Sequence, residues 1–165
     1  MAKKNSGQRE SSHGVPVPTG RLLAIGGKED KGSSKEEMQN PDFHNMEILG
    51  RFVEELKGDN PMIALIPTGS SVPDEMAEDY KEVFKKLKVS NVEVVDVRTR
   101  KDAKDPAFCE IINNAAGIFI TGGDQLKLTA TLGGTRLLQL MKERYTFDGI
   151  IVAGTSAGAA AMSTP

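Results

Sequence analysis

The chain has 165 residues, of which 38% are hydrophobic and 27% charged, with a formal net charge of -2. That length allows one domain with a hydrophobic core, and the charge lacks the basic excess of nucleic-acid-binding proteins. We therefore expect a small molecule or a peptide as partner, and no nucleic acid. The single cysteine, Cys109, excludes an intramolecular disulfide and leaves no second thiol for a metal site. We expect no metal, no cofactor and a cytoplasmic location.

The amino-terminal 20 residues (MAKKNSGQRESSHGVPVPTG) are polar, rich in Gly, Pro and Ser, and without periodicity. This composition predicts a flexible tail at residues 1–20, followed by one domain at residues 21–165. The tail lacks the apolar segment of a signal peptide, and no apolar run approaches the ~20 residues that cross a bilayer. We therefore expect no membrane partner.

Short apolar runs alternate with amphipathic stretches along the rest of the chain. The apolar runs predict strands at residues 22–26, 62–67, 92–97, 117–121 and 149–153, most of them nearly continuous, as in a parallel sheet buried on both faces. Helical spacing predicts four helices: one over about 41–56, one that starts at residues 73–75 and runs to 87, a short one at 108–112, and one at 137–141. The alternation predicts a three-layer α/β/α sandwich with a mostly parallel sheet.

Four predicted strands end in stretches of Gly and small polar residues, at 26–30 (GGKED), 67–71 (PTGSS), 121–125 (TGGDQ) and 153–158 (AGTSAG). In open parallel sheets, ligands bind beyond the carboxyl ends of the strands. The four stretches should therefore lie on one rim. Asp124, in the third stretch, precedes a helical run, so it should cap that helix; a contact with the substrate is the alternative.

The stretch GTSAG at residues 154–158 fits the G-x-S-x-G pattern of a nucleophile elbow, in which a serine sits on a tight turn between a strand and a helix. Small neighbours allow the sharp turn, and the N–H of Ala157 can donate to the oxygen that becomes negative during acyl transfer. One alternative is a small-residue turn that only lets a helix pack closely on the sheet. Phosphate binding is another, although neither G-x-G-x-x-G nor G-x-x-x-x-G-K-[ST] is present.

A nucleophilic Ser156 needs a base, and the sequence offers two histidines. His13 lies in the predicted tail, where nothing holds it in position. His44 lies near the start of a predicted amphipathic helix, which favours a solvated side chain. Either the serine is not catalytic, or its base lies beyond residue 165.

Five segments in order resemble cyanophycinases, serine-type hydrolases of the peptidase family that includes aspartyl dipeptidase (peptidase E). They are IGGKEDKG at 25–32, IPTGSSVP at 66–73, FITGGDQLKL at 119–128, LGGTRL at 132–137 and VAGTSAGAAAMS at 152–163. The Gly-Asp-Gln form looks more like cyanophycinase than peptidase E. The implied fold is flavodoxin-like, a layout shared with class I glutamine amidotransferase-like proteins; those have Cys at the elbow, where this chain has Ser156.

The resemblance implies an exopeptidase that hydrolyses cyanophycin, a poly-aspartate with arginine on each β-carboxyl, to β-Asp-Arg dipeptides. It implies Ser156 as nucleophile, an oxyanion hole at Gly123 and Ala157, and Gln125 and Asp124 at the substrate. Members of the family are often dimers, so a homodimer is expected for the full-length protein. An aspartyl-dipeptidase-like hydrolase and a non-catalytic remnant that binds peptide stay open as alternatives.

In the family, the histidine and the acidic partner follow the serine. We therefore expect a truncated domain whose catalytic partners lie beyond residue 165. On this view the 165-residue chain alone is inactive and poorly soluble. We expect the strand at 149–153 to be its exposed apolar edge.

Overall fold

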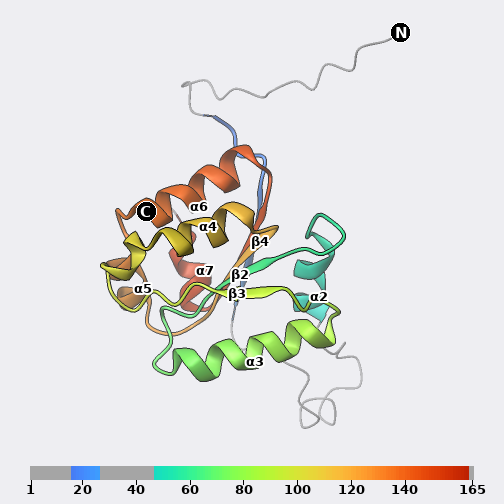
Figure 1. The fold of residues 1–165 in the computed structure, drawn as a ribbon, viewed down its shortest axis with the longest axis horizontal. Coiled ribbons are helices and arrows are strands. Elements are labelled where there is room, and N and C mark those ends of the chain that lie inside the picture. Colours follow the sequence, from blue (N-terminus) through green and yellow to red (C-terminus); the bar gives the residue numbers. More distant parts are fainter. Residues whose placement is uncertain (1–15, 27–46, 164–165) are drawn as a thin grey trace.

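Five parallel strands form one sheet in the order β1-β5-β4-β2-β3 (Figure 1). The computed structural model describes residues 16–26 and 47–163. The strands are β1 (Arg21–Ile25), β2 (Ile63–Ile66), β3 (Val92–Val94), β4 (Gly117–Ile120) and β5 (Ile151–Thr155). The helices are α2 (Glu47–Glu54), α3 (Pro73–Lys86), the 3-10 turn η1 (Asp102–Lys104), α4 (Pro106–Asn114), α5 (Gln125–Leu132), α6 (Arg136–Phe147) and α7 (Ala157–Ala161).

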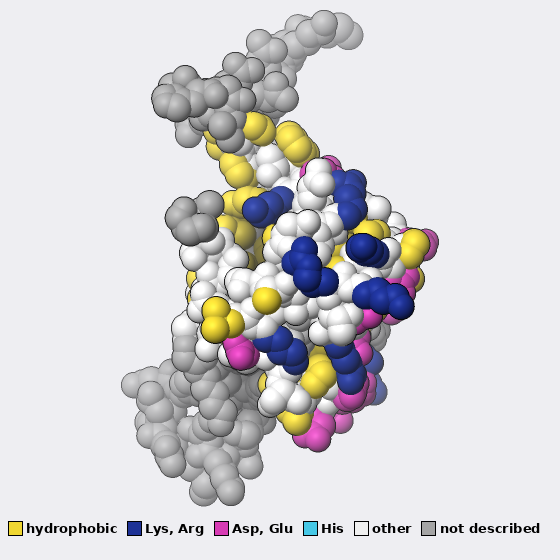
Figure 2. All heavy atoms as spheres, turned by 90° about the vertical axis from the view of Figure 1, so that its left-hand side faces the viewer, with side chains coloured by type: hydrophobic (Ala, Val, Ile, Leu, Met, Phe, Trp, Pro, Cys, Tyr) yellow, Lys and Arg dark blue, Asp and Glu magenta, His cyan; other side chains and the backbone are white. Residues whose placement is uncertain are grey.

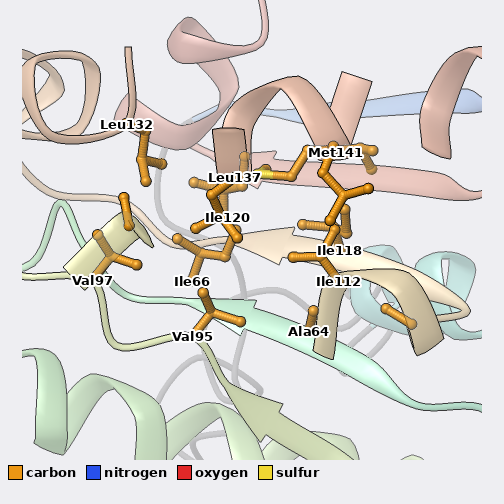
Figure 3. Close-up of a cluster of buried hydrophobic side chains, with 14 of the residues drawn as sticks. Ala64, Ile66, Val95, Val97, Ile112, Ile118, Ile120, Leu132, Leu137 and Met141 are labelled. Carbon is orange, nitrogen blue, oxygen red and sulfur yellow. The ribbon is translucent and has the colours of Figure 1, made fainter. Parts of the chain in front are cut away.

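Helices cover both faces of this sheet, which confirms the predicted three-layer sandwich. On one face Phe52 of α2 and Tyr80 and Phe84 of α3 surround Phe119 of β4, with ring centroids 4.9–5.4 Å from the Phe119 ring. On the other face, side chains of β2 and β4 meet those of α4, α5 and α6 (Figure 3). The labelled members of this second cluster are Ala64, Ile66, Val95, Val97, Ile112, Ile118, Ile120, Leu132, Leu137 and Met141.

The central strands are apolar at consecutive positions because neighbouring residues serve opposite cores. In β2, Ile63 and Leu65 belong to the cluster under α2 and α3, whereas Ala64 and Ile66 belong to the cluster under α4 to α6. Every residue of β2 and β4 is buried. This alternation explains why an apolar run without period 2 marked these strands correctly.

The strand at 92–97 is shorter than predicted. β3 ends at Val94, yet Val95 and Val97 are fully buried. The N–H of Val95 still donates to Leu65 of β2 at 2.8 Å, but the N–H of Val97 donates back to the Val95 carbonyl at 3.0 Å and leaves the ladder. Burial continues past the end of pairing here, so the apolar pattern overestimates the strand.

The expected exposed edge at residues 149–153 is wrong. β5 lies inside the sheet, paired with β1 on one side and with β4 on the other. Within the described residues, β1 and β3 are the outer strands. On the outer strand β1, Leu22 is 49% exposed. Continuous hydrophobicity shows that a strand is covered on both faces, but it does not give the order of strands.

Part of the predicted organisation falls outside the described residues. This holds for most of the tail, most of the 26–30 loop, the first part of the predicted helix at 41–56, and both histidines. At the described end of the tail, the N–H groups of Thr19 and Gly20 donate to Thr146 and Tyr145 of α6 at 3.0 and 2.9 Å. The division at residue 20 stays a prediction. In the described part of the chain, no helix is long and apolar enough to span a membrane.

Candidate active site

Ser156 occupies a strained turn between β5 and α7. Its backbone has φ 47° and ψ -109°, a conformation that favours glycine, and its side chain is exposed although both neighbours, Thr155 and Ala157, are buried. The N–H of Ser156 donates to Ile25 of β1 at 2.9 Å, so the sheet holds the turn in place. Because strain of this kind is concentrated at functional sites, the turn is a candidate for the predicted elbow.

Two glycines of GTSAG let α7 pack directly against the sheet. A Cβ at Gly154 would lie 2.5 Å from the carbonyl carbon of Gly158, and a Cβ at Gly158 would collide with the Ile120 carbonyl group of β4. The close helix packing proposed as an alternative to the elbow is therefore present. It does not replace the elbow, since the same contacts fix the turn that bears Ser156.

The loop after β4 lies against this turn. A Cβ at Gly122 would lie 3.4 Å from the Cβ of Ser156, which places the Gly122–Gly123 backbone beside the serine. Gly123 has φ 140° and packs on Gly69, whose carbonyl accepts the N–H of Asp124 at 2.8 Å. Three of the predicted rim loops, after β2, β4 and β5, are thus in contact.

Two N–H groups remain suited to an oxyanion hole. Ala157 is the first residue of α7, so its N–H has no acceptor within the helix. The dipole of α7 adds partial positive charge at this end of the helix, beside the serine. The N–H of Gly123 has no backbone acceptor among the described residues. Their catalytic roles stay predictions.

Asp124 caps α5, as its position before the helix predicts. One carboxylate oxygen, Oδ1, accepts the N–H groups of Leu126 and Lys127 at 2.8 and 3.1 Å. Gln125 follows as the first residue of the helix, with its side chain exposed to solvent. Substrate contacts of Asp124 and Gln125 stay predictions.

An open pocket of about 480 Å³ lies where the loops after β2 and β4 meet. Its lining residues are Gly69, Ser71, Gly123, Asp124 and Lys127. Lys127, on the first turn of α5, donates its ammonium group to the Ser70 carbonyl at 2.8 Å. The stretch at 67–71 was predicted at this rim from its sequence, whereas Lys127 was not. The available signal was its position three residues after the helix cap, on the turn that faces the rim.

Charged side chains also gather on the neighbouring loop after β3. Arg98 donates to Asp96 and to Asp74 of α3; the hydrogen bond and charge of Asp96, then the charge of Asp74, raise the pKa of its guanidinium. Asp102 accepts the N–H of Thr99 at 2.7 Å and the N–H of Arg98 at 3.1 Å. These hydrogen bonds lower the pKa of Asp102, and the bond from Thr99 contributes most.

Figure 2 shows the side of the molecule that carries α5, with Lys and Arg side chains scattered over its middle.

No histidine lies within residues 16–26 and 47–163, because His13 and His44 both fall outside them. The same described residues contain no group of three His, Cys, Asp or Glu side chains that could hold a metal ion. The described residues supply an exposed serine hydroxyl, two N–H groups near it without a backbone acceptor, and a pocket. They do not supply the base.

Residues 32–165 match the sequence model of a protein family, Peptidase family S51. The chain is 36% identical over 141 residues to a cyanophycinase of Geminocystis herdmanii, an alignment that covers 86% of this chain and 48% of that protein. It is 34% identical over 143 residues to a cyanophycinase of Synechococcus elongatus, an alignment that covers 87% of this chain and 41% of that protein. The chain thus spans about half the length of the curated relatives it matches.

Solved structures show the same fold. A peptidase from an acI-B1 actinobacterium superposes with a TM-score of 0.65 at 27% identity, covering 84% of this chain and 55% of that one. A putative peptidase E protein from Listeria monocytogenes superposes with a TM-score of 0.55 at 21% identity, covering 84% of this chain and 59% of that one. The second likeness supports the fold alone.

Proposed function

Because the chain belongs to Peptidase family S51, we propose that the complete protein containing it is a serine-type exopeptidase that hydrolyses cyanophycin to β-Asp-Arg dipeptides. The observation that carries the proposal is the conformation of Ser156, an exposed hydroxyl on a strained turn at the carboxyl end of a buried strand. The relatives that are cyanophycinases supply the substrate class.

In this mechanism the Ser156 oxygen attacks the scissile carbonyl carbon while its proton passes to a base. The carbonyl oxygen becomes an oxyanion and accepts hydrogen bonds from the N–H groups of Ala157 and Gly123. Collapse breaks the peptide bond, the amine leaves with the proton held by the base, and an acyl-enzyme remains. Water then attacks the ester and regenerates the serine.

The base is the part that we place outside the described residues. An elbow serine without a positioned base is a poor nucleophile, although oxyanion donors alone leave residual catalysis in serine hydrolases. We therefore expect the complete protein to be active and the 165-residue chain alone to be inactive. A homodimer and a cytoplasmic location stay part of the proposal.

The test incubates the complete natural protein with insoluble cyanophycin and detects released dipeptide by mass spectrometry. We expect β-Asp-Arg as product and a loss of about 10³-fold or more in rate for Ser156→Ala, as for other catalytic serines. Ser90→Ala, which changes an exposed serine just before the outer strand β3, is the matched control and should keep full activity.

Two outcomes would redirect the assignment. Hydrolysis of α-aspartyl dipeptides but not of cyanophycin would favour an aspartyl-dipeptidase-like enzyme. Absence of hydrolysis with either substrate, and no labelling of Ser156 by a fluorophosphonate, would favour a non-catalytic peptide-binding protein.

A further inference from the structure

From the pocket beside the elbow we infer that Lys127 binds a carboxylate group of the peptide substrate, which makes it a specificity-determining residue. This inference rests on the proposed function and deepens it, since it names the feature of the peptide that the site selects. The starting observation is that Lys127 is the cationic residue among the five that line the pocket.

The ammonium group of Lys127 is held in place but not neutralised within the described chain. It donates one hydrogen bond to the Ser70 carbonyl at 2.8 Å, which leaves two of its three N–H donors. It forms no ion pair with any residue in 16–26 or 47–163. The carboxylate of Asp124 in the same pocket accepts backbone N–H groups instead. A fixed cation with free donors at an open pocket is suited to an anionic ligand group.

The pocket lies next to the serine through the backbone of the loop after β4. Gly123 lines the pocket, and the preceding Gly122 lies against the Cβ of Ser156. A peptide whose scissile carbonyl is at Ser156 can therefore extend into the pocket. Its carboxylate would meet Lys127 within a short distance of the reacting bond.

Asp124 narrows the class of ligand further. Its Oδ1 is occupied by two N–H groups of α5, and its second oxygen, Oδ2, makes no hydrogen bond with the described residues. An ammonium at Lys127 and a carboxylate at Asp124, in a pocket that Ser71 also lines, fit a zwitterionic group better than a simple anion. An arginine-bearing aspartyl peptide has such a group, because it places a free carboxylate near a guanidinium or amide donor.

Two carboxylates of such a peptide share this chemistry: the α-carboxylate at the end of the aspartate backbone and that of the arginine branch. The experiment separates them. Binding to the complete protein carrying Ser156→Ala is measured by isothermal titration calorimetry, with short β-aspartyl-arginine peptides that are free at both carboxylates, amidated at the backbone end only, or amidated at the arginine only. Each peptide is titrated into this Ser156→Ala protein with Lys127 unchanged, with Lys127→Met added, and with Lys127→Arg added.

We expect Lys127→Met to weaken binding of the free peptide by about 10- to 100-fold, the effect of one charge-assisted hydrogen bond. If Lys127 binds the backbone carboxylate, amidation at the backbone end should remove the difference between Lys127 and Lys127→Met, and amidation at the arginine should preserve it. If Lys127 binds the arginine carboxylate, the two amidated peptides should give the reverse result. Lys127→Arg should retain most of the affinity, since it keeps the charge. Lys142→Met, an exposed lysine on α6 outside the pocket, should bind like the parent.

Equal weakening of the free and both amidated peptides would overturn the inference, because Lys127 would then act only by holding the Ser70 carbonyl. Unchanged affinity in Lys127→Met, or no peptide binding at all, would overturn it as well. These failures differ from failure of the proposed function, which is judged separately by cyanophycin hydrolysis in the protein with Ser156 intact.

Discussion

Ser156 shows how one residue can be kept in a conformation that its side chain disfavours. Its positive φ is imposed by hydrogen bonding to Ile25 on one side and by the start of α7 on the other. A residue held this way costs on the order of 1–3 kcal/mol, which the surrounding packing must offset. The strain belongs to the backbone, so it should be measurable after the hydroxyl is removed.

Two variants that both lack the hydroxyl test this strain. Ser156→Gly should have a free energy of unfolding about 1 kcal/mol higher than Ser156→Ala, because glycine adopts positive φ without a Cβ penalty. Urea denaturation of the two variants measures the difference. Equal stabilities would mean that the turn relaxes when the serine is replaced.

Gly158 should be intolerant of a side chain for a different reason. A Cβ there meets the Ile120 carbonyl group and lies 3.0 Å from the Thr121 oxygen, all backbone atoms that cannot rotate away. Gly158→Ala should lower the free energy of unfolding by about 1–3 kcal/mol and disturb Ser156. Gly26→Ala is the control, since a Cβ at Gly26 meets no atom of the described residues within 4 Å. A Gly158→Ala chain as stable as the control would contradict the packing argument.

The element that carries the pocket, α5, is fixed at both of its ends. Asp124 caps the amino end, and Arg100, on the loop after β3, donates to the carbonyls of Ala130 and Gly133 at 2.9 and 2.6 Å near the carboxyl end. Cations are favourable at this end of a helix because the last carbonyls lack partners. The position of Lys127 thus depends on a loop far from it in sequence.

Removing the guanidinium should loosen α5. Arg100→Met is expected to lower the free energy of unfolding by about 1 kcal/mol. Arg51→Met removes an exposed guanidinium that pairs with Glu54 in its own helix and with Glu55 directly after it, and should change the stability less. Hydrogen exchange of the α5 amides should rise in the first variant. Unchanged exchange there would show that Asp124 alone holds the helix.

The turn at η1 gives a pH dependence of known sign. The pKa of Asp102 is lowered in the folded chain, chiefly by the N–H of Thr99, so its stabilising contribution is present above the ordinary value of 3.8 and is lost as the pH falls below it. Asp102→Asn should therefore be less stable than the wild type at neutral pH. The gap should close on acidification, as followed by urea denaturation from pH 7 to pH 3. A constant gap would contradict this origin.

Element type was predictable here wherever an element buries a whole face or carries a clear start signal. Pro73 and the acids after it predicted the start of α3, and Asp124 predicted the helix that begins at Gln125. The end of β3 and the position of β5 in the sheet were missed, because they depend on pairing between distant segments. Lys127 was missed for the same reason: only the fold brings it to Gly69 and Gly123.

For the whole molecule, the outer strand that exposes a large apolar side chain is β1 and not β5. Leu22 is 49% exposed on a strand that has one neighbour in the described part of the chain. An outer strand of this kind tends to pair with another chain. The 165-residue chain should therefore self-associate through β1.

Leu22→Lys should raise the concentration at which the 165-residue chain self-associates by about tenfold, since a buried Leu contributes about 1.5–3 kcal/mol. Sedimentation velocity over a concentration series measures the shift. Leu126→Lys, which removes a 79% exposed leucine on α5, is the matched control and should change it little. A similar shift in both variants would mean that general hydrophobicity, and not β1, drives association.

The place of β5 between β1 and β4 also has a consequence for the order of folding. β1 is made first of the five described strands, but the strand it pairs with, β5, is made last of the five. Until then β4, β2 and β3 can pair among themselves, while β1 has no template. Closing so long a loop is slow, so the insertion of β5 between β1 and β4 should limit the rate at which these five strands assemble. The same event creates the turn at Ser156, so the Ser156 hydroxyl would reach its position only after β5 has paired with β1 and β4.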